Sequence, residues 1–331
     1  MMLLCFFIQI FCGTWLETPA SRPQDSTLLA RTHYAALADS CSLERNYSLL
    51  YDPSTYTSYW VAYPLCKAHL ATGREDSWAY DPSLPDSMQT SVLKNYMLER
   101  FETEHYKSNY YARGHQIPNA DRNASPAMQA QTYYSTNLTP QLQNGFNGLI
   151  WAKLEKGIRD CAQNYSDTLY VVTGASFTLQ TGCRVGEDTT RVNGDAPVVS
   201  DSGRDELSYV VNRNDGKRVP IPQWYWKAVL KVHRDTLGVP VQAVSVAFLL
   251  PHKDLKGRHY KEYVIPVDSL EAVTGFDFFP ALPDSLEMAC EARADWEAFQ
   301  KFDAEGGQPK QSTGQAPKQS KRSPQKPPKK K

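Results

Sequence analysis

The stretch most informative about the fold is residues 111–122, which read Tyr-Ala-Arg-Gly-His-Gln-Ile-Pro-Asn-Ala-Asp-Arg. Arg113 and His115 flank Gly114, a residue that lets the backbone approach a ligand closely. A neutral imidazole near a bound metal ion can take a proton from water near neutral pH. Because turn-forming and polar residues continue from here, we expect residues 111–145 to be loop and to carry a candidate general base.

A helix is expected directly after this loop, at residues 145–160. Its apolar residues have the i, i+3, i+4 spacing of a buried face: Phe146, Leu149, Ile150, Leu154 and Ile158. A different stripe is formed by Asn147, Trp151, Glu155 and Arg159, each four residues apart. This stripe predicts either a solvated face with a Glu155–Arg159 ion pair or oxygen ligands for a hard metal ion, with Arg159 beside them for a phosphate.

Apolar runs rich in β-branched and aromatic residues predict strands before and after this segment. The predicted strands are residues 47–51, 59–65, 167–174, 224–232 and 241–250. Turn residues at 52–54 and 214–216 separate extended stretches. The aromatic residues 224–226 favour packing in a core over stacking on nucleic-acid bases. No linker interrupts this pattern, so we expect one α+β domain at residues 45–303.

The remaining patterns predict shorter elements. We expect a short helix around residues 28–37, irregular structure at 71–110, and a helix capped by Asp268. Residues 276–280 are expected to pack apolar surface behind that helix. A terminal helix is predicted at residues 287–302.

The N-terminus favours export. An apolar run from Leu3 to Leu16 fits a secretory signal peptide with cleavage near Ala20, although no Lys or Arg precedes it, and it is short for a membrane span. We expect a signal peptide at residues 1–20, a flexible leader at 21–44, and a periplasmic or extracellular protein with no stable membrane insertion after signal removal. A lipoprotein is less favoured because Phe11, which is not small, precedes Cys12.

The charge is divided unequally along the chain. The whole sequence has 36 basic and 36 acidic residues, but residues 306–331 hold eight basic residues and no acidic one. Without those eight, 28 basic residues face 36 acidic ones, so the rest of the chain has a net charge of −8. The zero total argues against a uniformly basic nucleic-acid binder. Residues 304–331 are rich in Gln, Pro, Ser and Lys and predict a disordered basic tail.

Removal of a signal peptide would leave five cysteines: Cys41, Cys66, Cys161, Cys183 and Cys290. Export permits disulfides, and we expect a Cys161–Cys183 bond first and a Cys41–Cys66 bond second, with one cysteine left over. Neither a C-x-x-C motif nor a His/Cys cluster with zinc spacing is present.

Taken together, these residues resemble the DNA/RNA non-specific endonuclease family. The order and spacing of the matching residues agree over about fifty positions. The matches are Arg113-Gly114-His115, Pro118, Ala120-Asp121, Asn137, Thr139-Pro140-Gln141, Asn147, Trp151, Leu154-Glu155 and Arg159. The resemblance implies a ββα-metal (His-Me finger) fold with a mixed or antiparallel central sheet flanked by helices.

The resemblance also implies the roles of individual residues. It makes His115 the general base that activates water and Asn147 the direct protein ligand of a single Mg²⁺, with Mn²⁺ or another divalent cation as an alternative. Glu155 would orient metal-bound water, and Arg113 and Arg159 would contact phosphate. The implied substrates are DNA and RNA, and the implied products carry a 5′-phosphate and a 3′-hydroxyl.

One position departs from the family pattern. The residue before Arg-Gly-His is usually Asp in the family and is Ala112 here. We expect weaker metal binding or slower cleavage, with Asp121 partly supplying the missing carboxylate. The alternative function is a catalytically impaired protein that binds nucleic acid through the basic tail. A different hydrolase has no support, because the sequence lacks G-x-S-x-G, H-E-x-x-H and P-loop patterns.

Overall fold

The computed structural model describes residues 15–20, 27–37, 42–93, 96–98, 110–179 and 208–303, of which 96–98 are described by their backbone alone. The basic tail, Cys41 and Cys183 lie outside these ranges, so the disorder of the tail and both disulfide pairings stay predictions. Within the described ranges, none of the helices combines the length and the apolar character needed to cross a bilayer.

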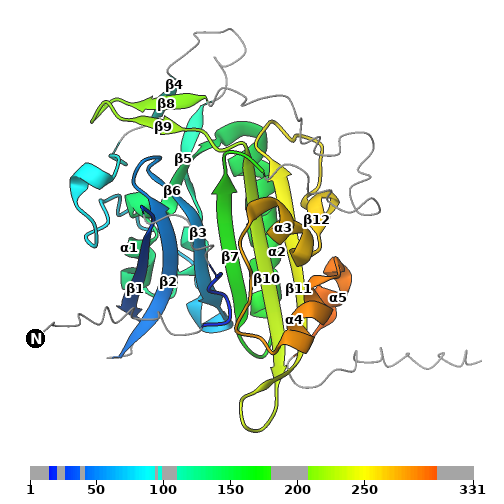
Figure 1. Ribbon diagram of the computed structural model, residues 1–331. Coiled ribbons are helices and arrows are strands. Elements are labelled where there is room, and N and C mark those ends of the chain that lie inside the picture. The colour runs from blue at the N-terminus through cyan, green and yellow to red at the C-terminus, as the bar shows by residue number, and fades with distance from the viewer. Residues whose placement is uncertain are drawn as a thin grey trace, which may run out of the picture.

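An antiparallel sheet of seven strands forms the centre of the molecule (Figure 1), in the order β1-β2-β3-β7-β10-β11-β12. The strands are β1 (Leu29–Ala36), β2 (Leu43–Asp52), β3 (Thr57–Leu65), β7 (Leu169–Ser176), β10 (Trp224–Arg234), β11 (Pro240–Pro251) and β12 (Val264–Ile265). This sheet confirms the five strands predicted from the apolar runs.

Two smaller sheets lie beside the large one. One contains β4 (Tyr96–Leu98), β8 (Tyr209–Asn212) and β9 (Arg218–Pro220), and the other is the hairpin of β5 (Tyr111–His115) and β6 (Leu138–Leu142). The turn between β8 and β9 contains residues 214–216, as the sequence predicts. Every strand pair in the described part of the chain is antiparallel.

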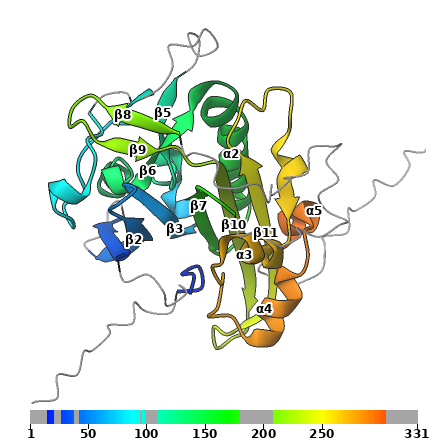
Figure 2. The same ribbon diagram turned by 45° about the horizontal axis from the view of Figure 1, so that its top comes forward.

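The helices cover both faces of the large sheet (Figure 2). They are α1 (Pro126–Gln131), α2 (Ala152–Gln163), α3 (Val267–Thr274), α4 (Asp284–Glu291) and α5 (Trp296–Lys301). A π-helical segment, Gln143–Trp151, leads into α2, which confirms the helix predicted at 145–160. The short 3-10 helices are Lys67–His69, Asp86–Met88, Asn119–Asp121, Ser135–Asn137 and Tyr260–Tyr263.

The central strands are mostly apolar because both faces are buried, although β10 also carries the buried Lys227 and Lys231. On β10, Tyr225 and Val229 belong to the core that includes α2, whereas Trp226 and Leu230 belong to the core that includes α3. Trp226 is fully buried, which confirms core packing for the aromatic run. Gly174 on β7 lies opposite Trp226, and a Cβ at Gly174 would lie 2.2 Å from the indole Cζ2, so only glycine fits there.

The structure corrects the predicted loop at residues 111–145 and the predicted leader at 21–44. The first contains β5, α1 and β6, whose polar side chains are largely buried against other polar groups. In the second, residues 29–36 form strand β1, where a short helix was expected around 28–37. Pairing of β1 with β2 along the sheet edge outweighs the weak helical preference of this Ala-containing segment.

The C-terminal predictions are partly wrong. Pro266, not Asp268, occupies the position before α3, and Asp268 lies in the first turn. The single helix predicted at 287–302 is instead two helices, α4 and α5, and Asp295 caps the second through its side chain. The prediction that residues 276–280 pack apolar surface is confirmed, because Phe278 and Phe279 are fully buried.

The segment 15–20 contacts the folded domain. Leu16 is buried in the core beside α3 and α4, and the buried Glu17 forms an ion pair with Arg45. Ala20 forms a backbone bridge with Asp277. The end of the predicted signal peptide therefore makes contacts that cleavage near Ala20 would remove.

Candidate active site

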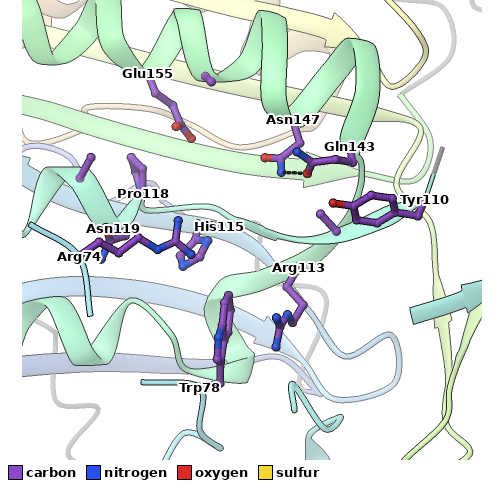
Figure 3. Close-up of a pocket in the computed structure, with 13 residues that line it drawn as sticks. Arg74, Trp78, Tyr110, Arg113, His115, Pro118, Asn119, Gln143, Asn147 and Glu155 are labelled. Carbon is purple, nitrogen blue, oxygen red and sulfur yellow. Dashed lines mark hydrogen bonds between the residues drawn. The ribbon is translucent and has the colours of Figure 1, made fainter. Parts of the chain in front are cut away.

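A pocket of about 370 Å³ lies where the β5–β6 hairpin meets the helix that follows it (Figure 3). Arg113, His115, Asn147 and Glu155 all line it, so four of the five predicted site residues are brought together. The remaining lining residues are Arg74, Trp78, Tyr110, Ala112, Pro118, Asn119, Ala120, Gln143 and Ala152. The pocket is therefore built by β5, the 3-10 turn that follows it and the helix that begins at Gln143, with Arg74 and Trp78 added from the segment between β3 and β4.

The hairpin fixes the position of His115 at the end of β5. Its register pairs His115 with Leu138 and Gly114 with Thr139. A Cβ at Gly114 would lie 2.3 Å from Gln141 Oε1, so glycine allows the hairpin backbone to approach the Gln141 side chain closely. The fully buried Asn137 holds the loop after β5, because its Oδ1 accepts from the Ile117 N–H at 3.0 Å.

The His115 ring packs between two aromatic rings and keeps a free nitrogen. Its centroid lies 5.5 Å from that of Trp78 and 5.1 Å from that of Tyr133. Nε2 has no hydrogen-bond partner in the described part of the chain. Burial, followed by the positive charge of Arg74, lowers the pKa of His115 to about 3. The imidazole is therefore neutral at physiological pH and able to accept a proton.

Asn147 and Glu155 lie about two turns apart on this helix and both project toward the same pocket (Figure 3). Asn147 Nδ2 donates to Gln143 Oε1 at 2.8 Å, which leaves the amide oxygen Oδ1 on the other side, facing the pocket. Trp151, which lies between them in sequence, is 1% exposed. The stripe of residues four apart is therefore not a solvated face, and the first interpretation of it is wrong.

A buried lysine that the sequence reasoning missed lies behind Glu155. Lys227 on β10 is fully buried, and its ammonium donates to the Gln116 carbonyl at 3.2 Å. Burial raises the pKa of Glu155, and the charges of Lys227 and Arg159 oppose that rise. Burial also lowers the pKa of Lys227, and the carboxylate of Glu155 counteracts this. Each charge therefore helps keep the other ionised.

Arg159 does not line the pocket. Its Nη1 lies 2.9 Å from Asp121 Oδ1 in an ion pair, and Asp121 Oδ2 accepts from the Tyr63 hydroxyl at 2.9 Å. Asp121 is 1% exposed and already has two partners. The expectation that Asp121 replaces the carboxylate absent at Ala112 is therefore wrong. Its position shows a structural pair that fixes α2 against the loop after β5.

The cationic side of the pocket comes partly from residues that the sequence reasoning missed. Arg113 stacks its guanidinium 3.7 Å above the Trp78 ring, and Arg113 Nη1 donates to the Val92 carbonyl. The exposed Arg74 also lines the pocket, and Asp76 accepts from its Nε at 2.7 Å. Both guanidiniums suit a phosphate because they remain charged at any relevant pH. Arg74 and Trp78 lie in a segment without periodicity, so no sequence pattern singled them out.

The pocket fits a hydrated hard cation better than a fully protein-ligated ion. It offers the amide oxygen of Asn147 and the carboxylate of Glu155, while Ala112 contributes no ligand atom. Among the described residues, the one group of three acidic, His or Cys side chains close enough to share an ion lies elsewhere, at Asp268, Glu271 and Glu291. Few protein ligands leave coordination positions for water and phosphate oxygens.

Comparisons with known proteins agree with this geometry. The DNA/RNA non-specific endonuclease family matches residues 26–285. A mitochondrial nuclease EXOG of Danio rerio is 28% identical over 242 residues, which cover 72% of this chain and 60% of that protein. A nuclease of Syncephalastrum racemosum is 27% identical over 254 residues, which cover 73% of this chain and 68% of that one.

A solved structure of EndoG in complex with EndoGI has the same fold. It superposes with a TM-score of 0.52 at 19% identity and covers 77% of this chain and 88% of that chain. The predicted ββα-metal fold is confirmed, and the family places the chain among nucleic-acid hydrolases that depend on a divalent metal. The chain belongs to the DNA/RNA non-specific endonuclease family.

Proposed function

We propose that this protein hydrolyses phosphodiester bonds in both DNA and RNA at the pocket around His115, in the presence of Mg²⁺. The observation that carries the proposal is the unpartnered Nε2 of a neutral His115 in the same pocket as Asn147 and Glu155. Asn147 Oδ1 would hold the cation directly and Glu155 would hold it through water. A bound Mg²⁺ supplies positive charge that stabilises the phosphate and the leaving oxygen.

The side chains of the pocket divide the remaining work. His115 Nε2 takes the proton of the attacking water. Arg113 and Arg74 bind the phosphate, and the Trp78 ring limits the positions that the Arg113 side chain can adopt. Arg159 acts by holding Asp121 and by lowering the pKa of Glu155. It does not line the pocket, so we propose this indirect role in place of the phosphate contact that the resemblance implies.

We also propose export to the periplasm or the medium, on the basis of the apolar run that ends at Leu16. The contacts of Leu16 and Glu17 with the domain provide a test. Sequencing the N-terminus of protein recovered from the cell exterior shows whether residues 15–20 are retained. Recovery only from the cytoplasm would contradict export.

The function is tested with purified protein, plasmid DNA and RNA, with Mg²⁺ or with EDTA. The parent should cut both nucleic acids with Mg²⁺ and neither with EDTA. Asn147→Ala should need about 10- to 100-fold more Mg²⁺ for half-maximal rate. Asn164→Ala is the matched control, because Asn164 is exposed at the end of the same helix. Metal-independent binding without cleavage by the parent would instead support an impaired nucleic-acid-binding protein.

A further inference from the structure

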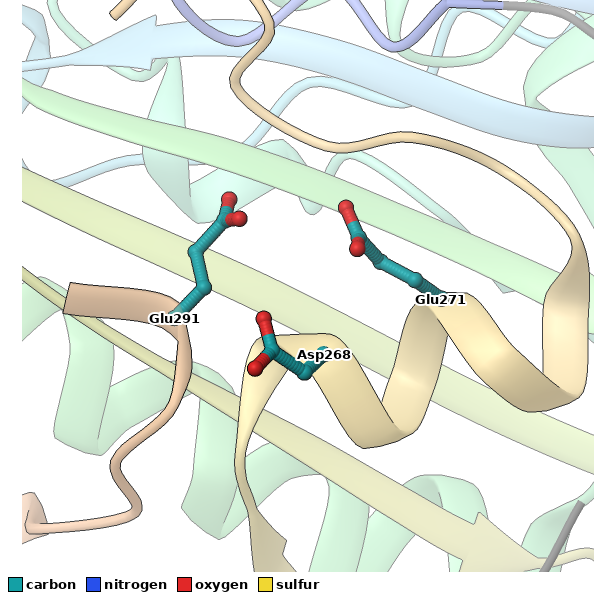
Figure 4. Close-up of side chains that lie close together, drawn as sticks. All are labelled: Asp268, Glu271 and Glu291. Atoms are coloured by element: carbon teal, nitrogen blue, oxygen red, sulfur yellow. The ribbon is translucent and has the colours of Figure 1, made fainter. Parts of the chain in front are cut away.

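Three carboxylates converge away from the pocket, on the other face of the large sheet (Figure 4). Asp268 and Glu271 lie three residues apart on α3, and Glu291 is the last residue of α4. One oxygen from each of the three side chains lies within 4.8 Å of the others. Two oxygens bound to one Ca²⁺ at about 2.4 Å are at most about 4.8 Å apart, so the three can share such an ion.

Glu291 is the member of this acidic cluster that most needs a positive partner. Its side chain is 3% exposed, and Oε1 has no hydrogen-bond partner in the part of the chain that the structure describes. Figure 4 shows its carboxylate directed at those of Asp268 and Glu271. Its place at the C-terminal end of α4 adds the negative end of the helix dipole. A buried, unpaired carboxylate is costly, so a proton or a cation must offset the charge.

The surroundings of the acidic cluster contain further acids. Glu287 on α4 and Asp277 after α3 face the same carboxylates and raise their pKa values. Within the described ranges, no lysine or arginine forms an ion pair with Asp268, Glu271 or Glu291. Burial first, and neighbouring acids next, raise the pKa of Glu291 to about 9. Burial likewise raises the pKa of Glu271 to about 7.

We propose that Asp268, Glu271 and Glu291 form a Ca²⁺ site that joins α3 to α4. All donors are carboxylate oxygens, which suit a hard cation, and the unequal exposure of the three leaves room for water ligands on the side of Asp268. Mg²⁺ fits less well, because its octahedral geometry at 2.0–2.1 Å demands a tighter set. Since both helices pack on β11 opposite α2, the ion stabilises the fold and takes no part in cleavage.

Calcium binding is tested by thermal unfolding and by calorimetric titration. Both are done in an Asn147→Ala background, so that the pocket around His115 does not contribute. In EDTA, Glu291→Gln should unfold at a higher temperature than its parent, because the amide needs neither a proton nor a cation to be buried beside Asp268 and Glu271. With Ca²⁺ at about 100 times its Kd, the Tm of the parent should rise by about 5 °C. Glu291→Gln should lose that rise and the calorimetric signal.

Two further variants complete the experiment. Asp268 is exposed, so Asp268→Asn should fold normally and should weaken Ca²⁺ binding at least tenfold. This variant keeps the test valid if Glu291→Gln does not fold. Asp284→Asn removes an exposed acid from the first turn of α4 and should retain the full response. A parent without a Ca²⁺-dependent rise, or a rise that Glu291→Gln and Asp268→Asn both keep, overturns the site.

Discussion

The pocket around His115 and the acidic cluster on α3 and α4 both contain a buried glutamate whose pKa is raised by burial. Glu155 in the pocket has Lys227 and Arg159 nearby, and both lower its pKa. The neighbouring charges that act on Glu291 in the described part of the chain are acids, led by Glu271, and each raises its pKa further. A count of carboxylates would favour the acidic cluster as a metal site.

The difference favours the pocket over the acidic cluster as the site of the proposed cleavage. A phosphodiester is an anion, so the carboxylates of the acidic cluster and of its neighbours Glu287 and Asp277 would repel it. The pocket combines one carboxylate with the guanidiniums of Arg74 and Arg113, so a cation and a phosphate can bind together. The acidic cluster can accept a cation but offers nothing to an anionic substrate. Substitutions that remove positive charge from around the pocket, or add a carboxylate to it, make it resemble the acidic cluster and so test this difference.

The largest effect on stability is expected from Arg159→Leu, which removes the charged partner of the buried Asp121 and leaves it the hydrogen bond from Tyr63. The free energy of unfolding should fall by about 2 kcal/mol, because a buried carboxylate loses a charged hydrogen-bond donor. Urea unfolding measures this. Lys156→Leu is the control on the same helix: its ion pair with Asp160 is exposed, and the change should stay below about 0.5 kcal/mol. Equal losses in both variants would refute a special role for the Arg159–Asp121 pair.

Next in size is Lys227→Met, which removes the positive charge that lowers the pKa of Glu155 most strongly. The pKa of Glu155 should then rise further, so a larger fraction is protonated at pH 7. If the ionised form is needed, the acid limb of the pH–rate profile moves up by about one unit, and cleavage at pH 7 falls about tenfold.

Cleavage by Lys227→Met should recover as the pH is raised, which a simple loss of structure would not produce. Lys231→Met is its control, because Lys231 lies on the same strand, is also buried, and donates to the carbonyls of Phe299 and Phe302. A pH–rate profile that shifts equally in both variants would show that Glu155 is not the group affected.

The smallest effect is expected from Ala112→Asp, which adds a carboxylate to the pocket lining. It should lower the Mg²⁺ concentration for half-maximal cleavage about threefold, by analogy with other groups that support metal ligands. A metal titration of initial rates measures it. If Mg²⁺ binding is unchanged or weakened, the alanine is not what limits metal affinity.

Site residues that lie close together in the sequence could be predicted, whereas those brought to the pocket from distant segments were missed. His115, Arg113, Asn147 and Glu155 lie within one hairpin and one helix, so their order and spacing could carry the resemblance to the family. Lys227 is a charge inside an apolar strand, a signal that was present but was not connected to Glu155. Arg74 reaches the pocket from an irregular segment, and local pattern could not show that.

Two mistakes have the same physical origin. β1 was expected to be a helix because its pairing with β2 could not be inferred from a local pattern. Asp268 was expected to cap α3, yet its carboxylate approaches Glu291, more than twenty residues away. Long-range packing decides both, and burial of polar groups along β5 and β6 similarly hid two strands within an apparent loop.

The most direct test of the proposed function is whether His115 acts as the general base. Single-turnover cleavage of DNA by His115→Gly, with and without added imidazole, measures this. We expect the cleavage rate to fall by at least about 100-fold while the fold stays intact. Added imidazole should restore part of the rate in proportion to the concentration of its neutral form. His233→Gly, at the far end of β10 from Lys227, should cut like the parent. Cleavage by His115→Gly at the rate of the parent would show that His115 is not the general base.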